Sequence, residues 1–112
     1  MLDLKAWLEE ATGEPVYETT APPSSDRYEL PFVVFIDVVE RSGSDDQNMI
    51  TYHTLTIERY SEDGAKNAGL EAALDEKGLH YNREPLWISD DEMYEEVYQL
   101  LTDIIERSDI NA

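Results

Sequence analysis

The residues of this sequence whose types could bind a metal or transfer a proton are two histidines and several acidic pairs. His53 and His80 each lie in a segment whose pattern predicts a β-strand. Neither histidine has a partner at the spacing of a zinc site, and the chain contains no cysteine, so the sequence predicts no zinc centre. A single histidine on a strand is usually a packed or surface residue rather than a ligand.

Acidic residues adjoin one another in two predicted turns, at Asp45-Asp46 and at 90–92. Paired carboxylates can hold a divalent cation, but neither group has the spaced oxygens of a calcium loop, so we interpret both as solvated acids. The sequence also lacks a glycine-rich phosphate loop and a nucleophile elbow, and its loop serines have no matching histidine and aspartate. We therefore expect a protein with no enzymatic activity, no cofactor and no bound metal.

Two helices are predicted from the spacing of apolar residues. The first spans 3–11, where apolar side chains recur at positions i, i+3, i+4 and i+7 and Asp3 is a suitable N-cap. The second spans 64–77, with Ser61 or Asp63 as its cap and a glycine at its end.

Strands are predicted at 15–20, 32–39, 49–60 and 79–84 from β-branched and aromatic residues. The run 32–39 is apolar almost throughout, which indicates a strand covered on both faces or a strand at an interface. It forms a hairpin with 49–60, and the polar segment between them is the hairpin tip. Pro85 either breaks the last of these strands or places it at a sheet edge.

The segment 87–100 fits two different periods. Helical spacing places Met93, Tyr94, Val97 and Tyr98 on one face, whereas strand alternation places Tyr94, Glu96 and Tyr98 together. The aromatic residues of the C-terminal third favour packing in the core, with a protein interface as the alternative, because tyrosine and tryptophan are enriched at interfaces.

These patterns together predict an α+β fold in one domain, 1–112. We expect an antiparallel sheet of four to five strands with two α-helices packed on it, the N-terminal helix 3–11 and the central helix 64–77. No apolar run approaches the length of a membrane span, and the charged N-terminal segment lacks the apolar centre of a signal peptide, so we expect no contact with a membrane. The absence of cysteine fits a reducing cytoplasm.

The charge balance is strongly acidic, with 26 acidic residues, 8 basic residues and a formal net charge of −18. Such a surface repels nucleic-acid phosphates, so direct reading of DNA or RNA is not expected. Three interpretations of the acidity are open. It can keep the protein soluble, it can form a wall past which DNA slides without binding, or it can mimic DNA phosphates and block a DNA-binding enzyme.

Four segments, taken in order, resemble the small tail-completion proteins (tail-terminator or head–tail joining proteins) of long-tailed bacteriophages. They are the strand Pro31-Phe-Val-Val-Phe35 before a polar turn, a strand that ends in Ile57-Glu-Arg-Tyr60, a helix, turn and strand over 70–81, and the closing segment from Trp87 to Tyr98 with its Tyr-Glu-x-x-Tyr pattern. The resemblance covers 31–100 and consists of residue-type patterns rather than catalytic signatures.

The resemblance implies helices packed on an antiparallel sheet and a closing segment that is a strand. It also implies an assembly protein without catalysis, a ring usually of six copies that caps the tail tube and docks it to the head connector. The partners would be further copies of this chain, the tail tube and the head–tail connector. The protein would be made in the host cytoplasm and located in the tail or neck of the virion, and DNA would pass through its acidic lumen without specific binding.

This sequence departs from the family at Glu96, where the family usually has an aliphatic residue, and in the segment 101–107, whose pattern is compatible with a helix. We expect 92–101 to be a strand. An acidic DNA-mimic inhibitor of a host DNA-binding enzyme is the alternative function. The candidate interface comprises the hairpin tip and two tyrosines of the closing segment, namely Gly43, Asp45, Asp46, Asn48, Tyr94 and Tyr98.

Overall fold

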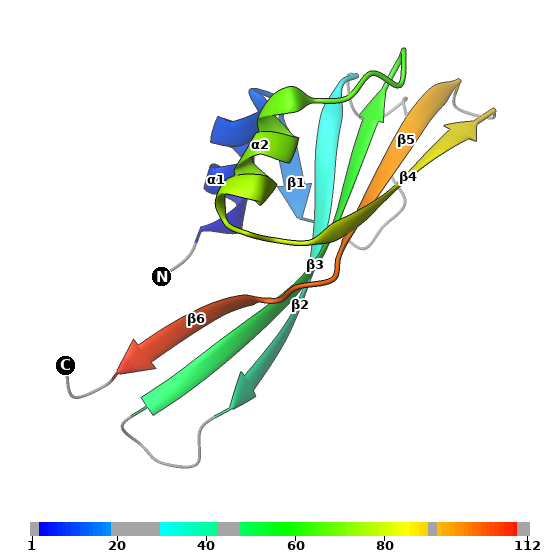
Figure 1. Cartoon of the computed structure of the whole chain (residues 1–112). Helices are drawn as coiled ribbons and strands as arrows, with labels where there is room; N and C mark the ends of the chain where they lie inside the picture. The colour runs from blue at the N-terminus through cyan, green and yellow to red at the C-terminus, as the bar shows by residue number, and fades with distance from the viewer. Residues whose placement is uncertain (1–2, 19–29, 43–47, 90–91, 110–112) are drawn as a thin grey trace.

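The computed structural model describes residues 3–18, 30–42, 48–89 and 92–109, and its two helices pack on one face of a six-stranded sheet (Figure 1). In chain order the elements are α1 (Leu4–Thr12), β1 (Val16–Glu18), β2 (Phe32–Ser42), β3 (Asn48–Ser61), α2 (Ala68–Glu76), β4 (Tyr81–Ile88), β5 (Met93–Leu100) and β6 (Ile104–Asp109). The predicted α+β class is confirmed, whereas the predicted number of four to five strands is too low.

The strands lie in the order β1-β2-β3-β5-β4, and β6 pairs with β3 beyond the end of β5. β1 runs parallel to β2, with Val16 opposite Val33, and the other pairs are antiparallel. The prediction of a purely antiparallel sheet is therefore wrong. A parallel pair needs a connection of about a dozen residues or more, and the segment 19–31 is long enough to supply it.

β3 is the longest strand, and it pairs with two different strands on the same side. Its residues 56–61 pair with β5, whereas its residues 48–53 pair with β6. The pattern of 101–107 is compatible with a helix, but this interpretation is wrong from residue 104 onward, because Ile104–Asp109 is a strand. The unpaired backbone groups of β3 beyond β5 provide hydrogen-bond partners that a separate helix would have left unused.

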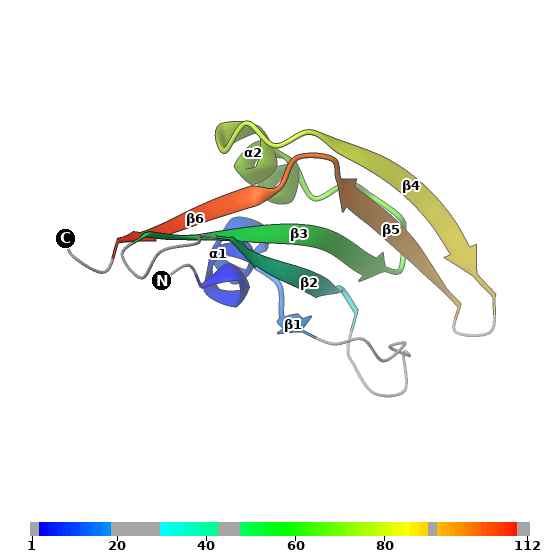
Figure 2. The ribbon, with the colours of Figure 1, turned by 90° about the horizontal axis from the view of Figure 1, so that it is seen from below.

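The part of the sheet beyond the helices forms a three-stranded arm, which we define as residues 38–42 of β2, 48–54 of β3 and Ile104–Asp109 of β6. Figures 1 and 2 show the arm projecting away from the body that carries α1 and α2. The molecule is accordingly elongated, with principal extents of 51 × 26 × 21 Å.

The main core lies between the helices and the sheet. It is built from Leu4, Leu8, Val16, Val33, Phe35, Leu55, Ile57, Leu70, Leu74, Leu79, Tyr98 and Leu100. A smaller cluster lies on the opposite face of the sheet, where Phe32, Val34, Tyr60 and Met93 are buried. There the rings of Phe32 and Tyr60 stack with centroids 4.9 Å apart. Both clusters belong to the body, and the first residue of the arm's strand β6, Ile104, packs against the main one.

The helix ends follow from local capping. The Asp3 side chain accepts a hydrogen bond from the backbone nitrogen of Ala6 at 3.0 Å, which confirms it as the cap of α1. α2 is shorter than the predicted 64–77. It begins at Ala68 because the Asn67 side chain caps it by accepting from the backbone nitrogen of Leu70.

The two predicted caps of α2 have another role. Ser61 and Asp63 accept hydrogen bonds from the backbone nitrogens of Gly64 and Ala65, so they order the turn before the helix. Gly69 lies where α2 crosses α1. A Cβ atom there would lie 2.1 Å from the carbonyl oxygen of Ala11, so only glycine permits this approach of the two backbones.

The strand prediction for 92–101 is confirmed, since β5 spans Met93–Leu100. β4 continues past Pro85, which lies opposite Glu96 in the pairing with β5. Pro85 is tolerated because β4 is an edge strand, and a proline without a backbone N–H fits an outward position there.

Candidate assembly surface

The predicted interface residues at the hairpin tip lie largely outside the described part of the chain. This applies to Gly43, Asp45 and Asp46, whereas Asn48 begins β3 and pairs with Asp109 of β6. Participation of the tip in an interface therefore stays a prediction.

The two predicted interface tyrosines of β5 have different environments. Tyr94 is 36% exposed, and its ring lies 4.8 Å from that of Trp87, which is 53% exposed on β4. Tyr98, by contrast, is fully buried, and its hydroxyl lies 2.8 Å from a carboxylate oxygen of Glu71 and 3.0 Å from one of Glu96. Tyr94 is therefore a surface residue, and Tyr98 is a core residue of the single chain.

The arm exposes large apolar side chains on both of its faces. Val38 and Ile105 are 62% and 61% exposed on the face away from the helices, and Val39 is 47% exposed on the other face. Single exposed apolar residues are common on protein surfaces, whereas a contiguous patch of them marks an interaction site. Residues 32–35 of the apolar run 32–39 are buried, as the interpretation of a strand covered on both faces predicts, whereas an interface at Val38 and Val39 stays a prediction.

The outer edge of β2 is also open over most of its length. β1 pairs only with residues 33–35, so residues 36–42 have no strand partner on that side within the described part of the chain. Open edges with apolar neighbours are sites for strand addition by another chain.

His53 joins the three strands at the base of the arm. Its Nδ1 lies 2.8 Å from Oδ2 of Asp37 on β2, and its Nε2 lies 3.3 Å from Oε1 of Glu106 on β6. Burial lowers the pKa of His53, but the hydrogen bonds and charges of the two carboxylates outweigh it and raise the pKa above its ordinary value. The sequence placed His53 on a strand but could not show these partners, because they come from distant segments.

A buried ion-pair network ties the helix face of the body together. The guanidinium of Arg59 donates two hydrogen bonds to Glu14, at 2.9 and 2.8 Å, and a third to the carbonyl oxygen of Ala65. These bonds to Glu14 raise the pKa of Arg59. The fully buried Glu96 accepts a hydrogen bond from Nε of Arg83 at 3.0 Å and lies 3.6 Å from Nη1 of Arg59. The network also includes the Tyr98 hydroxyl, which lies beside Glu71 and Glu96, and its cations and carboxylates compensate one another's buried charge.

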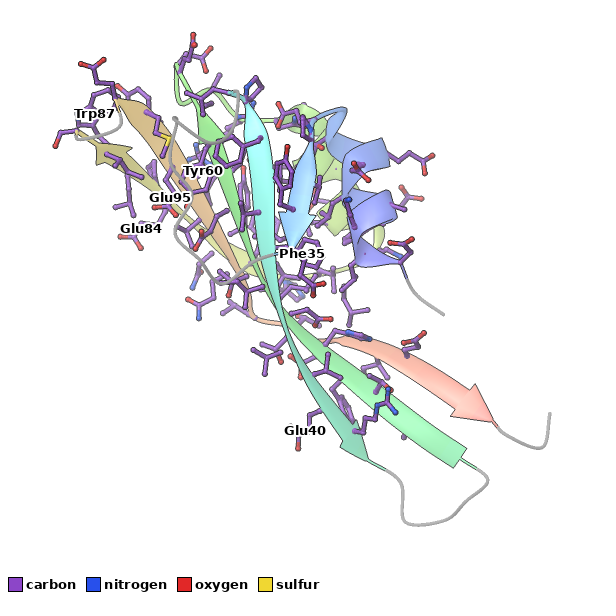
Figure 3. The ribbon with its side chains drawn as sticks, turned by 180° about the vertical axis from the view of Figure 1, so that it is seen from behind. Phe35, Glu40, Tyr60, Glu84, Trp87 and Glu95 are labelled. Atoms are coloured by element: carbon purple, nitrogen blue, oxygen red, sulfur yellow. The ribbon has the colours of Figure 1, made fainter. Side chains whose placement is uncertain are left out.

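An acidic cluster lies on the opposite face of the sheet, as Figure 3 shows for Tyr60, Glu95 and Glu84. The Tyr60 hydroxyl lies 2.8 Å from Oε2 of Glu58 and 2.7 Å from Oε2 of Glu95. Burial, followed by these two carboxylates, raises the pKa of Tyr60. Burial also raises the pKa of Glu95, and the negative charge of Glu58 adds to this rise against the hydrogen bond from Tyr60.

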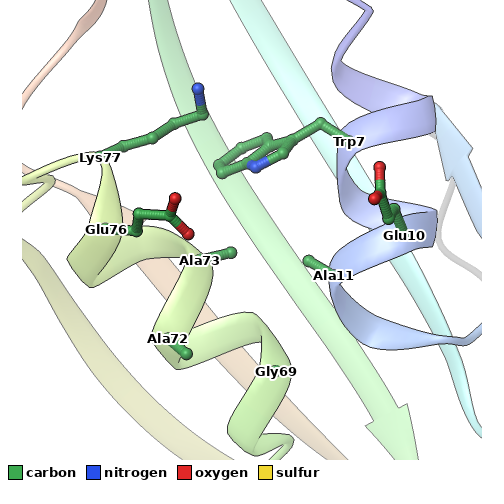
Figure 4. A pocket seen from close by; sticks show the side chains of 8 residues that line it. All are labelled: Trp7, Glu10, Ala11, Gly69, Ala72, Ala73, Glu76 and Lys77. Carbon is green, nitrogen blue, oxygen red and sulfur yellow. The ribbon is translucent and has the colours of Figure 1, made fainter.

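A groove of about 390 Å³ lies between α1 and α2 (Figure 4). The small residues Ala11, Gly69, Ala72 and Ala73 line it together with Trp7, Glu10, Glu76 and Lys77. The ammonium nitrogen of Lys77 lies 5.1 Å from the centroid of the Trp7 ring, so a cation of the chain itself already contacts this aromatic surface.

Within the described residues, no group of three or more histidines and carboxylates is placed to hold a metal ion. Across those same ranges, no helix has both the length and the apolar character that a membrane crossing requires. No protein-family model matches this chain, and no curated protein matches it.

Proposed function

We propose that this protein is a structural assembly protein of a long-tailed phage, which ends the tail tube and joins it to the head–tail connector. It acts as a ring of identical chains and performs no catalysis. The observation that carries this proposal is the arm, whose two faces and open β2 edge present apolar side chains and free backbone groups to a neighbour.

The two edges of the sheet allow a head-to-tail ring, in which one edge of a chain meets the other edge of its neighbour. One side ends in β1 and the open edge of β2, and the other side ends in β4 and β6, so the two edges are unlike. A contact between unlike surfaces repeats from chain to chain and closes into a ring when the rotation allows it. The resemblance described above leads us to expect six copies.

Two further features support the family assignment. The closing segment Met93–Leu100 is a strand, as the resemblance implied, and both helices pack on one face of a sheet dominated by antiparallel pairs. The acidity fits as well. A net charge of −18, with Glu58, Glu84 and Glu95 on the face away from the helices, would let DNA pass a ring without binding to it.

The test compares arm variants by size-exclusion chromatography with light scattering and by negative-stain imaging. Val38→Ser combined with Ile105→Ser removes apolar contacts on one face of the arm, and we expect it to shift rings towards monomers. The matched control is Leu101→Ser, because Leu101 is 62% exposed but lies outside the arm. Rings that persist unchanged in the double variant would contradict the role of the arm.

An acidic inhibitor that mimics DNA is the second candidate. The acidic face around Glu58 and Glu95 favours it, since carboxylates on one sheet face could occupy a phosphate-binding surface. It predicts that the monomer competes with DNA for a host nuclease. A nuclease that cleaves DNA at the same rate with and without an excess of this protein would rule out that nuclease as the target.

A further inference from the structure

His53 lies where β3 changes its neighbour. The pairing with β5 ends at Thr56, and the pairing with β6 starts at His53, which faces Ile104 on one side and Val39 of β2 on the other. The imidazole therefore lies at the junction of the body and the arm, where β3 has β2 on one side and β6 on the other.

The geometry around the ring favours the protonated form of His53. Nδ1 and Nε2 each face a carboxylate oxygen, at 2.8 Å on Asp37 and 3.3 Å on Glu106, and the side chain of His53 is only 10% exposed. A neutral imidazole has one N–H and one lone pair, so one of its nitrogens would point a lone pair at a carboxylate. The imidazolium can donate to both carboxylates at once, which neither neutral tautomer can do.

Few other charged groups face this site from the strands packed against it. On β2 these groups are Asp37 and Arg41. Arg41 lies further along the arm, opposite Thr51, which is also opposite Glu106 of β6. Arginine stays charged throughout the accessible pH range, and carboxylates ionise well below neutrality in their ordinary range. Histidine is the side chain whose ordinary ionisation lies close to neutral pH.

We propose that protonated His53 is a clamp that fastens β6 to β2 across β3, so that loss of its proton loosens the arm. The observation behind it is the pair of contacts from one imidazole to carboxylates on two different strands. The proposal concerns the single chain, and it holds or fails independently of the ring.

The direction of the pH effect follows from the linkage between protonation and folding. The folded chain raises the pKa of His53 above its value of 6.5 in an unfolded chain. Stabilisation by the clamp is therefore fully present below pH 6.5 and is lost as the pH rises through the raised pKa. The arm is expected to be best ordered below the raised midpoint of His53 and to loosen above it.

The experiment is an NMR titration of His53 in the full chain. We expect its midpoint to lie above 6.5, the ordinary value for histidine. Amide-exchange protection of 104–109, corrected for intrinsic exchange, should fall about tenfold as the pH rises through the His53 midpoint. A midpoint of His53 at or below 6.5, or protection of β6 that does not change across the midpoint, would overturn the proposal.

Variants separate the clamp from a general effect of pH. His53→Gln should remove the pH dependence of β6 protection, and His80→Gln should retain it. Should His53→Gln fail to fold, Glu106→Gln provides the second test, because removal of one carboxylate must lower the midpoint of His53. An unchanged midpoint in Glu106→Gln would contradict the clamp even if the fold is intact.

Discussion

Arg59 and Glu96 lie opposite each other on β3 and β5, and their side chains meet at 3.6 Å between Nη1 and Oε1 inside the body. The proposed assignment to the phage-tail family leads to an aliphatic residue at the position of Glu96. The structure gives a physical reason for a carboxylate there, because Arg59 and Arg83 flank Glu96 from the strands on either side. An aliphatic residue there would leave two partly buried cations without this carboxylate.

Glu96→Gln tests the importance of this network. Removing one partner of a buried ion pair leaves the other charges uncompensated, so we expect unfolding free energy to fall by about 3 kcal/mol. Urea denaturation followed by circular dichroism measures this loss. Glu84→Gln on the exposed part of β4 is the matched control and should change stability by less than about 0.5 kcal/mol. Equal effects of the two substitutions would show that the network adds little.

Gly69→Ala tests the crossing of α1 and α2. Whether the substitution raises or lowers stability shows how closely the two helices must approach. In most exposed helix positions a glycine-to-alanine change stabilises the helix by about 1 kcal/mol. Here the added Cβ would meet the Ala11 carbonyl oxygen at 2.1 Å, so we expect a loss of about 1–3 kcal/mol instead. Thermal unfolding of the variant against Ala72→Ser, an exposed position of α2, measures the difference. A stabilised variant would show that α1 can move away from α2 at little cost.

Glu95→Gln tests the acidic cluster around Tyr60. Since the fold raises the pKa of Glu95, its ionisation opposes folding, and the favourable contribution of the protonated form is lost as the pH rises through the raised pKa. Glutamine is neutral at every pH, so we expect the variant to melt at a higher temperature than the natural chain at pH 7. The difference in melting temperature between the two proteins should disappear near pH 4, as Glu95 of the natural chain becomes protonated. A constant gap between pH 4 and pH 7 would argue against this charge effect.

The clamp at His53 also predicts a pH dependence of assembly. A loosened arm exposes less ordered surface to a neighbour, so the fraction of chains in rings should fall as the pH rises through the His53 midpoint. Light scattering at fixed protein concentration and ionic strength would measure this fraction in the natural chain and in His80→Gln. Rings that persist unchanged above this midpoint would show that assembly does not depend on the clamp. They would not contradict the clamp within the single chain.

The elements with a strong local pattern could be predicted from the sequence. The cap at Asp3, the hairpin of β2 and β3 and the strand β5 all follow from residue types and spacing close to them in the chain. β5 is the instructive case, because its period alone was ambiguous and the ordered resemblance decided for a strand.

The features that escaped prediction depend on contacts between distant segments. β6 is a strand because β3 extends past β5, which a local pattern cannot reveal. In the same way, Tyr98 is buried because α2 supplies Glu71 as a partner for its hydroxyl. The carboxylates that bind His53 come from β2 and from the C-terminal strand, so a lone histidine in the sequence gave no sign of them.

The molar mass of the assembled species is the most direct test of the central proposal. Native mass spectrometry or light scattering, applied to the protein alone and with tail-tube and connector proteins, should find a closed ring. We expect a mass about six times the 12.9 kDa of one chain. A mass of one chain at every concentration, unchanged by either partner, would contradict the assignment as a ring-forming assembly protein.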